Sequence, residues 1–439
     1  MVMLAGEPGI GKTNPARKLT DLADQRGAKV LWGWCHEQTG APPYWPWLQL
    51  IRSQLVTTDT EKLRQDMRPR AADIAQILPE LSAILEGLDH PPVLRAEQPR
   101  FRLFFSITIF LKNVSRTQPL ALVLDDLHWA DESSLLLLEF LAREISSFPI
   151  MVMGTYRDNE VTGSHPLVQT LSSLVRENNF LRVSLTGLNR EEVGDLVAAK
   201  AGVAVPEEAV DSLHQRTEGN PLFVSEVVSA VTPEEMSRNQ DWVAGIPQAI
   251  KEAISRRLGR VSETCNEILR SASIIGRDFN LQLIRTLSPG ISEDSFSEAI
   301  DEANSIGFVE IMPSGFEGYR FSHTLIQQVV YRETAPMQRA QTHLAAAEAL
   351  EKLYWEHLGE HAGESAYHFS QSKTISGPEK LVRYSRMAGE FSLKSYAHDE
   401  ALTIFQQGLA AKEGSEMDAE SASLLFGLGR AQLAALGRN

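Results

Sequence analysis

The stretch Gly6-Glu7-Pro8-Gly9-Ile10-Gly11-Lys12-Thr13 fits the pattern G-x-x-x-x-G-K-[ST] of a phosphate-binding P-loop. An apolar run at 2–5 precedes it, and helix-forming residues follow from Ala16 to Ala23, so the motif lies between a predicted strand and a predicted helix. Glycines let the backbone curl until successive N–H groups point at phosphate oxygens, and the helix N-terminus adds partial positive charge. This context favours a nucleotide phosphate site over a chance Gly/Pro turn.

The residues of the motif have separate expected roles. The residues expected to bind the phosphates through their backbone are Gly6, Gly9, Ile10 and Gly11. Lys12 would reach the β- and γ-phosphates of ATP or ADP, and Thr13 would bind Mg²⁺. Pro15 falls in the first turn of the following helix, where its missing N–H breaks no internal hydrogen bond.

A second part of the predicted site follows the apolar run 120–124, which ends in Asp125 and Asp126. A run that is apolar on both faces fits a central parallel strand, and ligands bind at the carboxyl ends of such strands. Asp125 is placed to hold the hydration shell of Mg²⁺, and Asp126 could orient or activate the attacking water. A polar turn would be the simpler interpretation without the P-loop.

A third apolar run, 150–154, leads into Thr155, Tyr156, Arg157 and Asp158. Arg157 is therefore expected at the same edge of the sheet. It could contact the γ-phosphate through two parallel hydrogen bonds, and we count it with Lys12 and Asp126 as a candidate catalytic residue. The alternative is an Arg–Asp surface pair with no catalytic role.

Composition limits the possible classes of protein. A chain of 439 residues needs several cores, and none of its apolar runs reaches the length of about 18 residues that a membrane span needs. Two cysteines offer neither a disulfide framework nor a metal-ligand spacing, so a cytoplasmic location without membrane contact is expected. The net charge of −15 argues against direct nucleic-acid binding by this segment.

The pattern of elements predicts four parts. Strands alternating with helices over 1–188 indicate an α/β domain with a parallel sheet covered by helices. Short helices at 189–245 form a helical arm, and helices followed by a hairpin at 246–335 indicate a winged helix. Helices at 336–439 alternate small and aromatic residues, as tetratricopeptide repeats do, although a plain helical bundle is the alternative. The abrupt start and end suggest a fragment or a mis-assigned start.

Taken together, five strings resemble the STAND class of signalling ATPases, and within it the ATPase region of large ATP-binding regulators of the LuxR type and their AAA-like relatives. Their order and spacing cover roughly residues 1 to 335. The strings are Gly6–Thr13, Leu122–Asp131, Gly154–Asp158, Glu218-Gly219-Asn220-Pro221-Leu222-Phe223 and Arg320-Phe321-Ser322-His323-Thr324-Leu325-Ile326.

The resemblance implies two further nucleotide contacts and a function. Pro221 would pack against the adenine, and His323 would touch the β-phosphate of ADP, unless it is a capping or core histidine. The chain would be a switch that hydrolyses ATP slowly and self-associates in its ATP state. An effector protein or small-molecule inducer would act at the C-terminal repeats, and the output would be transcriptional, through a DNA-binding module outside this chain.

Two other classes of protein remain open at this point. A motor or remodelling ATPase would need steady turnover and an arginine finger presented to a neighbour, and no string identifies one. A helical scaffold with a degenerate nucleotide site would need no turnover at all. Trapped ADP favours the switch, an empty site favours the scaffold, and fast turnover favours the motor.

Overall fold

The computed structural model describes the whole chain except residues 38–39, 86–96, 178, 203–204, 231–253, 256, 313–317, 413–417 and 437–439. The sequence also predicts a polar linker at 234–241, a helix at 246–258 and a turn at 313–315. The linker, the turn, most of this helix and the boundary predicted at 245 lie outside the described residues.

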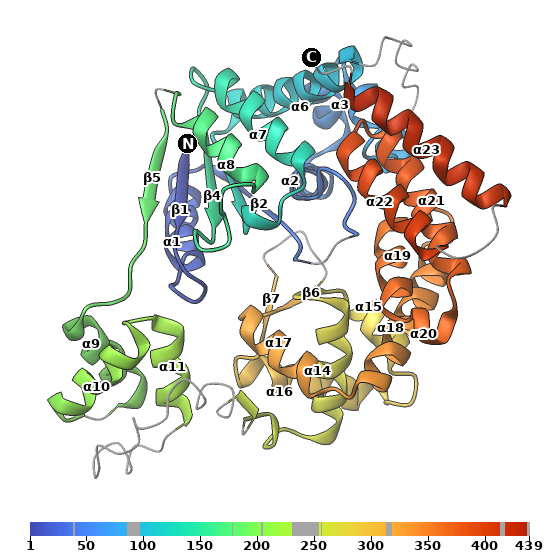
Figure 1. The fold of residues 1–439 in the computed structure, drawn as a ribbon. Coiled ribbons are helices and arrows are strands. Elements are labelled where there is room, and N and C mark those ends of the chain that lie inside the picture. The colour runs from blue at the N-terminus through green and yellow to red at the C-terminus, as the bar shows by residue number, and fades with distance from the viewer. Residues whose placement is uncertain are drawn as a thin grey trace.

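A five-stranded parallel sheet forms the first part of the chain (Figure 1). Its strands are β1 (Val2–Ala5), β2 (Lys29–Trp34), β3 (Leu120–Asp125), β4 (Ile150–Tyr156) and β5 (Leu181–Ser184). The spatial order β2-β3-β4-β1-β5 places β4 between the P-loop strand and the strand that ends in Asp125. The carboxyl ends of all five strands therefore meet at one edge, and the predicted α/β fold is confirmed.

Helices cover both faces of this sheet. They are α1 (Thr13–Gln25), α2 (Trp45–Thr57), α3 (Thr60–Met67), α4 (Ala71–Ile74), α5 (Glu80–Ile84), α6 (Glu97–Thr117), α7 (Glu132–Glu144) and α8 (Pro166–Leu174). All six residues of β3 are buried, as expected for a central strand with helices on either side. Tyr44, the N-cap of α2, and Trp47 in its first turn are both part of the main core, so these aromatic residues have a packing role.

Three helices make up the arm: α9 (Arg190–Ala201), α10 (Glu207–Thr217) and α11 (Pro221–Ala230). A capping box opens α9, where the Asn189 side chain accepts from the N–H of Glu192 and the Glu192 carboxylate accepts from the N–H of Asn189. The arm follows β5 and lies apart from the sheet in the view of Figure 1, but the start of α11 contacts the P-loop through Leu222.

The third unit combines helices with a small antiparallel sheet. Its helices are α14 (Glu263–Ile275), α15 (Leu281–Leu287), α16 (Glu293–Ser305) and α17 (Thr324–Glu333). Its strands β6 (Asp278–Phe279), β7 (Val309–Ile311) and β8 (Tyr319–Phe321) pair in the order β6-β8-β7. The two predicted hairpin strands are present, a further strand β6 was not predicted, and the winged-helix interpretation stays a prediction.

The C-terminal part is helical and curves back to the first domain (Figure 1). It consists of α18 (Pro336–Leu353), α19 (Ala362–Gln371), α20 (Lys373–Ser376), α21 (Glu379–Lys394), α22 (His398–Ala411) and α23 (Ala419–Leu436). The Tyr396 hydroxyl donates to Gln76 Oε1 at 2.6 Å, and the Ser133 hydroxyl donates to Glu400 at 3.2 Å. These contacts connect the helical part directly to the first domain.

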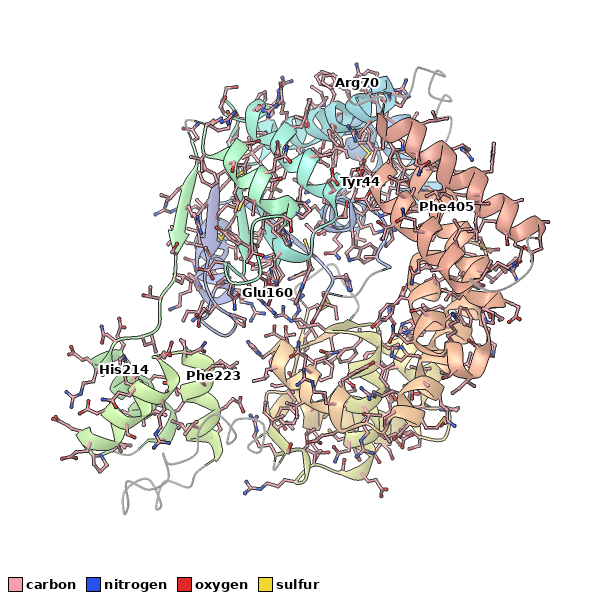
Figure 2. All side chains as sticks on the ribbon, in the orientation of Figure 1. Tyr44, Arg70, Glu160, His214, Phe223 and Phe405 are labelled. Atoms are coloured by element: carbon pink, nitrogen blue, oxygen red, sulfur yellow. The ribbon has the colours of Figure 1, made fainter. Side chains whose placement is uncertain are left out.

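Close packing around Phe405 gives a testable feature of the last three helices (Figure 2). A Cβ atom added at Gly427 would lie 2.4 Å from this buried ring, whereas one added at Gly429 on the same helix would meet open space. We expect Gly427→Ala to destabilise the chain by about 1–3 kcal/mol through overpacking. Gly429→Ala should be neutral or stabilising by up to about 1 kcal/mol. Urea unfolding followed by circular dichroism measures both, and equal midpoints for the two variants would contradict this packing.

Candidate nucleotide site

The P-loop connects β1 to α1 in a curled conformation. Gly9 and Gly11 have φ angles of 82° and 93°, in the left-handed region that glycine adopts without a steric penalty. Ile10 is buried and packs against Gly6, while Thr13 is the first residue of α1. The predicted strand–loop–helix context is confirmed, and the backbone N–H groups of the loop lie next to a helix N-terminus, where anions bind.

Lys12 is buried and folds back over its own loop. Its Nζ donates to the carbonyl oxygens of Gly6 at 2.8 Å and Glu7 at 2.9 Å. Burial lowers the pKa of Lys12, and the nearby carboxylates of Asp126 and Asp125 oppose that shift. Within the described residues Lys12 has no ion-pair partner, and an ammonium carries three donors, so one donor remains for a phosphate oxygen.

The arm holds the P-loop through Asn220. Its Nδ2 donates to the carbonyl oxygen of Pro8 at 2.9 Å, and its Oδ1 accepts from the N–H of Leu222 at 3.1 Å. The same N–H also approaches the carbonyl oxygen of Gly9, at 3.3 Å. Pro221 stands between these two residues as the first residue of α11, and an adenine contact by Pro221 stays a prediction.

The two acidic residues after β3 are held by Thr155 of β4. The Thr155 hydroxyl donates to Asp125 Oδ1 and accepts from the backbone N–H of Asp126, the latter at 2.9 Å. Asp126 adopts a left-handed conformation with φ of 60°. Asp125 Oδ2 is buried without a hydrogen-bond partner among the described residues, so its lone pairs are free to accept from a water bound to a cation. Asp125 therefore fits the role of holding hydrated Mg²⁺.

Two arginines of the third unit reach this same edge. Arg277, just before β6, forms an ion pair with Asp126. Arg320 of β8 lies with Nη1 3.9 Å from Asp125 Oδ2, while its other nitrogens bind both carboxylate oxygens of Asp278 at 2.8 and 3.0 Å. The edge of the sheet is thus covered by guanidinium groups from a distant part of the chain.

The surroundings shift the pKa values of the two carboxyl groups in opposite directions. Burial and then the charge of Asp126 raise the pKa of Asp125. Burial acts in the same direction on Asp126, but the positive charges of Arg277 and other neighbouring groups outweigh it, so the pKa of Asp126 is lowered. Asp126 is therefore ionised and paired with Arg277 in this arrangement.

Arg157 lies at the predicted edge, but its partners differ from the surface pair considered for it. Nη1 donates to Glu160 at 2.6 Å, Nη2 donates to the Thr324 hydroxyl at 3.1 Å, and the guanidinium lies 4.5 Å from the ring centre of Trp129. The side chain is only 10% exposed. Arg157 is thus a buried residue that connects the α/β domain to the start of α17, and a γ-phosphate contact stays a prediction.

His323 is the N-cap of α17, as the capping alternative expected. Its Nδ1 accepts from the N–H of Leu325 at 3.0 Å. Burial, followed by the charges of Arg277 and Arg157, lowers the pKa of His323 to about 3, so the ring is neutral at physiological pH. Because Nδ1 is the acceptor, the proton is on Nε2, and this N–H is the group that could donate to a phosphate oxygen.

Four contacts at this edge were not assigned from the sequence. Thr155, Asn220 and Arg320 lie inside the strings that carried the resemblance, so their positions were noticed but their roles were not. Arg277 belongs to none of these strings, and its ion pair with Asp126 joins residues that are 151 positions apart. Periodicity and local motifs give no signal for such a contact.

The neutral state of His323 predicts how stability depends on pH. In the unfolded chain the His323 ring is protonated below about pH 6.5, whereas in the folded chain it stays neutral down to about pH 3. This residue therefore lowers the free energy of unfolding as the pH falls through that window. His323→Asn keeps a capping acceptor without titrating. The variant should gain about 1.4 kcal/mol relative to the parent between pH 7.5 and 5.5. Thermal midpoints measure the difference, and a difference that is independent of pH would refute the neutral buried ring.

Comparisons with known proteins agree with this geometry. Residues 1–153 match the family described as AAA ATPase domain, and residues 189–236 match a domain of unknown function, DUF8739. An uncharacterized protein of Rhizobium meliloti (strain 1021) is 24% identical over 364 residues, which are 78% of this chain and 34% of that protein. This chain therefore spans about a third of the length of that curated relative.

One solved structure covers nearly the whole chain. It is a signal transduction ATPase with numerous domains (STAND) with a tetratricopeptide repeat sensor, from Pyrococcus horikoshii. It matches with a TM-score of 0.53 and 16% identity, over 99% of this chain and 61% of its own. Residues 1–153 are therefore similar to the AAA ATPase domain family, and the chain shares the fold of that STAND protein with its tetratricopeptide-like helical part.

Proposed function

We propose that the chain is an ATP/ADP-dependent signalling switch and that the structure represents its closed, resting arrangement. The observation that supports this proposal is the ion pair between Arg277 of the third unit and Asp126 of the ATPase domain. Arg277 engages one oxygen of this carboxylate and holds the side chain in place, which would hinder it from orienting a water molecule. Hydrolysis would therefore be slow while the third unit covers the edge of the sheet.

The nucleotide would bind between the P-loop, the arm and the third unit. The backbone of Gly6–Thr13 and Nζ of Lys12 would bind the phosphates, and Pro221 would pack against the adenine. Thr13 and Asp125 would hold Mg²⁺, which neutralises phosphate charge when bound. His323 would donate its Nε2–H to the β-phosphate of ADP only while α17 lies over the site, so ADP would favour the closed arrangement.

The switch accounts for the contacts better than the two alternatives do. A degenerate scaffold has no need for a P-loop lysine with a spare donor or for a buried acidic pair held by Thr155. A motor would present an arginine to a neighbouring subunit, whereas Arg277 and Arg320 are directed at the acids of their own chain. Opening would release Asp126 and expose the edge to self-association in the ATP state.

The wider role is proposed from the resemblance. The closed arrangement would open when an effector protein or small-molecule inducer binds the C-terminal helices, and the output would be transcriptional, through a module outside this chain. We place the protein in the cytoplasm and expect no direct nucleic-acid contact from this segment, whose net charge is −15. Within the described residues, the structure contains no helix long and apolar enough to cross a membrane.

Replacing the P-loop lysine tests the nucleotide site. Lys12→Ala removes the charge that would lie on the β/γ-phosphates, and calorimetry should show ADP and ATP affinity weakened at least tenfold, or about 1.4 kcal/mol. Lys18 is an exposed lysine on α1, the helix that follows Lys12, so Lys18→Ala serves as the control and should bind as the parent does. Equal affinities for the parent and Lys12→Ala would rule out this site.

Removing the covering arginine tests the closed arrangement. Arg277→Gln leaves Asp126 unpaired, which should favour the open form by about 1–3 kcal/mol of coupling. ATP hydrolysis and ATP-dependent self-association should both rise about tenfold, measured by phosphate release and by sedimentation. Arg285→Gln in the same unit removes an arginine that pairs with Glu293 instead, and it should change neither. Unchanged hydrolysis and self-association in Arg277→Gln would show that this ion pair does not restrain the switch.

A further inference from the structure

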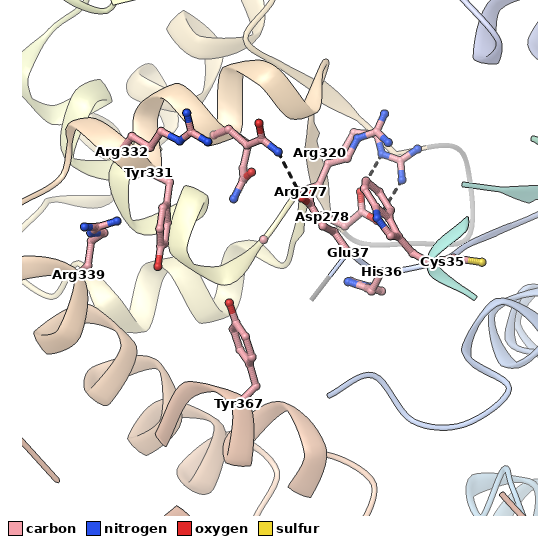
Figure 3. Close-up of a pocket in the computed structure, with 14 residues that line it drawn as sticks. Cys35, His36, Glu37, Arg277, Asp278, Arg320, Tyr331, Arg332, Arg339 and Tyr367 are labelled. Atoms are coloured by element: carbon pink, nitrogen blue, oxygen red, sulfur yellow. Dashed lines mark hydrogen bonds and ion pairs between the residues drawn. The ribbon is translucent and has the colours of Figure 1, made fainter. Parts of the chain in front are cut away.

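A cavity of about 460 Å³ lies where three parts of the chain meet (Figure 3). Residues 35–37, directly after β2, contribute one wall, and Gly276–Asp278 with α17 of the third unit contribute another. Arg339 of α18 and Tyr367 of α19 complete it from the helical part. Its volume falls within the range of about 300–1,000 Å³ that is typical of small-molecule sites.

Positive charge dominates this cavity, although the chain as a whole is acidic. Four arginines line it, Arg277, Arg320, Arg332 and Arg339, against the two carboxylates of Glu37 and Asp278, which leaves a difference of 4 − 2 = +2. The net charge of the chain is −15. An excess of cations in a cleft between domains raises the local concentration of anions, and here Arg332 stands on the exposed side while Arg339 is half-buried.

The pairing of these charges shows which arginines are available. Arg320 binds Asp278 with two hydrogen bonds, and Arg277 is engaged by Asp126 outside the cavity. Burial raises the pKa of the Glu37 carboxyl group, which accepts from Gln328 at 3.3 Å. Two arginines remain, Arg332 and Arg339, and neither has an ion-pair partner among the residues that the structure describes.

An aromatic side chain stands beside Arg339. The guanidinium of Arg339 lies 4.9 Å from the ring centre of Tyr331, and Tyr367 faces Tyr331 across the cavity. In Figure 3 the two hydroxyl groups point toward each other from α17 and α19. Planar guanidinium groups bind carboxylate or phosphate oxygens through pairs of parallel hydrogen bonds, and aromatic faces pack against flat apolar bodies.

We propose that this cavity binds a small organic anion that has a planar body and a carboxylate or phosphate group, with Arg332 and Arg339 as the anion contacts. The site is separate from the P-loop, and its residues come from the first domain, the third unit and the C-terminal helical part. Its effect on signalling rests on the proposed function, but the binding itself does not.

The position of the cavity determines the direction of this effect. A ligand shifts a conformational equilibrium only toward the state that it binds more tightly. The walls come together in the closed arrangement, because Arg277 and Arg320 line the cavity while they cover the acids of the ATPase domain. The anion would therefore stabilise the resting form and act as a repressing ligand rather than as an inducer.

Calorimetry on the full chain carrying Lys12→Ala tests the site without nucleotide binding. The probes are isophthalate and phenyl phosphate, with the neutral isophthalamide as the matched control. We expect at least one anion to bind, isophthalamide not to bind, and Arg332→Gln combined with Arg339→Gln to weaken binding at least tenfold. Arg383→Gln removes an exposed arginine that likewise lies near a tyrosine ring but is outside the cavity, and it should leave the affinity unchanged.

Three results would overturn the site: neither anion binds, the double variant binds as tightly as its parent, or ADP displaces the anion from the Lys12-containing chain in direct competition. A double variant with lysine at both positions keeps the charge, so its retained binding would show that a loss with glutamine is not misfolding. The bound anion should also reduce ATP-dependent self-association at least threefold. Binding without this reduction would leave the site standing and refute the repressing role.

Discussion

The arrangement of the whole chain depends on two adjacent buried carboxylates. Asp125 and Asp126 emerge at the end of a strand that is buried along its full length, and both side chains are almost inaccessible to water. Burying an ionised carboxylate is costly unless hydrogen bonds and opposite charges compensate for it. Thr155 of the neighbouring strand donates to the Asp125 carboxylate and accepts from the backbone N–H of Asp126, while the positive charges of Arg277 and Arg320 come from the third unit. The need to compensate these buried carboxylates thus favours a position of the third unit in which its arginines lie against the edge of the sheet.

The same edge shows why the nucleotide-binding residues are spread over the sequence. A P-loop supplies phosphate contacts by itself, but its conformation needs support from outside the strand and helix that flank it. Asn220 supplies this support with a hydrogen bond to the carbonyl of Pro8, and Gly9 has no side chain where Asn220 and Leu222 approach. The arm therefore supports the conformation of the P-loop directly, through Asn220 and Leu222.

The sequence predicted the parts of the fold that short-range patterns encode. The strands of the sheet and the position of the P-loop follow from apolar runs and from a motif whose glycines have a steric purpose, and the acids after β3 were placed correctly on the same grounds. The strand β6 was missed because two residues carry no periodicity. The pairing of Arg277 with Asp126 was missed because it depends on how two folded units pack against each other, and local sequence patterns contain no information on such packing. The roles of Pro221 and His323 rest on resemblance, although the structure places Pro221 beside the P-loop and makes His323 a neutral helix cap.

The arginines of the third unit link the nucleotide edge to the neighbouring cavity. Arg277 and Arg320 face the acids of the ATPase domain and also line the space between β2, α17 and α19. If the third unit moves, one side loses the compensation of Asp126 and the other loses a wall of the cavity. Two sites become thermodynamically linked when both are built from the same movable element, because each ligand then biases its position. The third unit, which carries Arg277 and Arg320, is such an element. It gives a physical route by which an anion in the cavity and a nucleotide at the P-loop would influence each other.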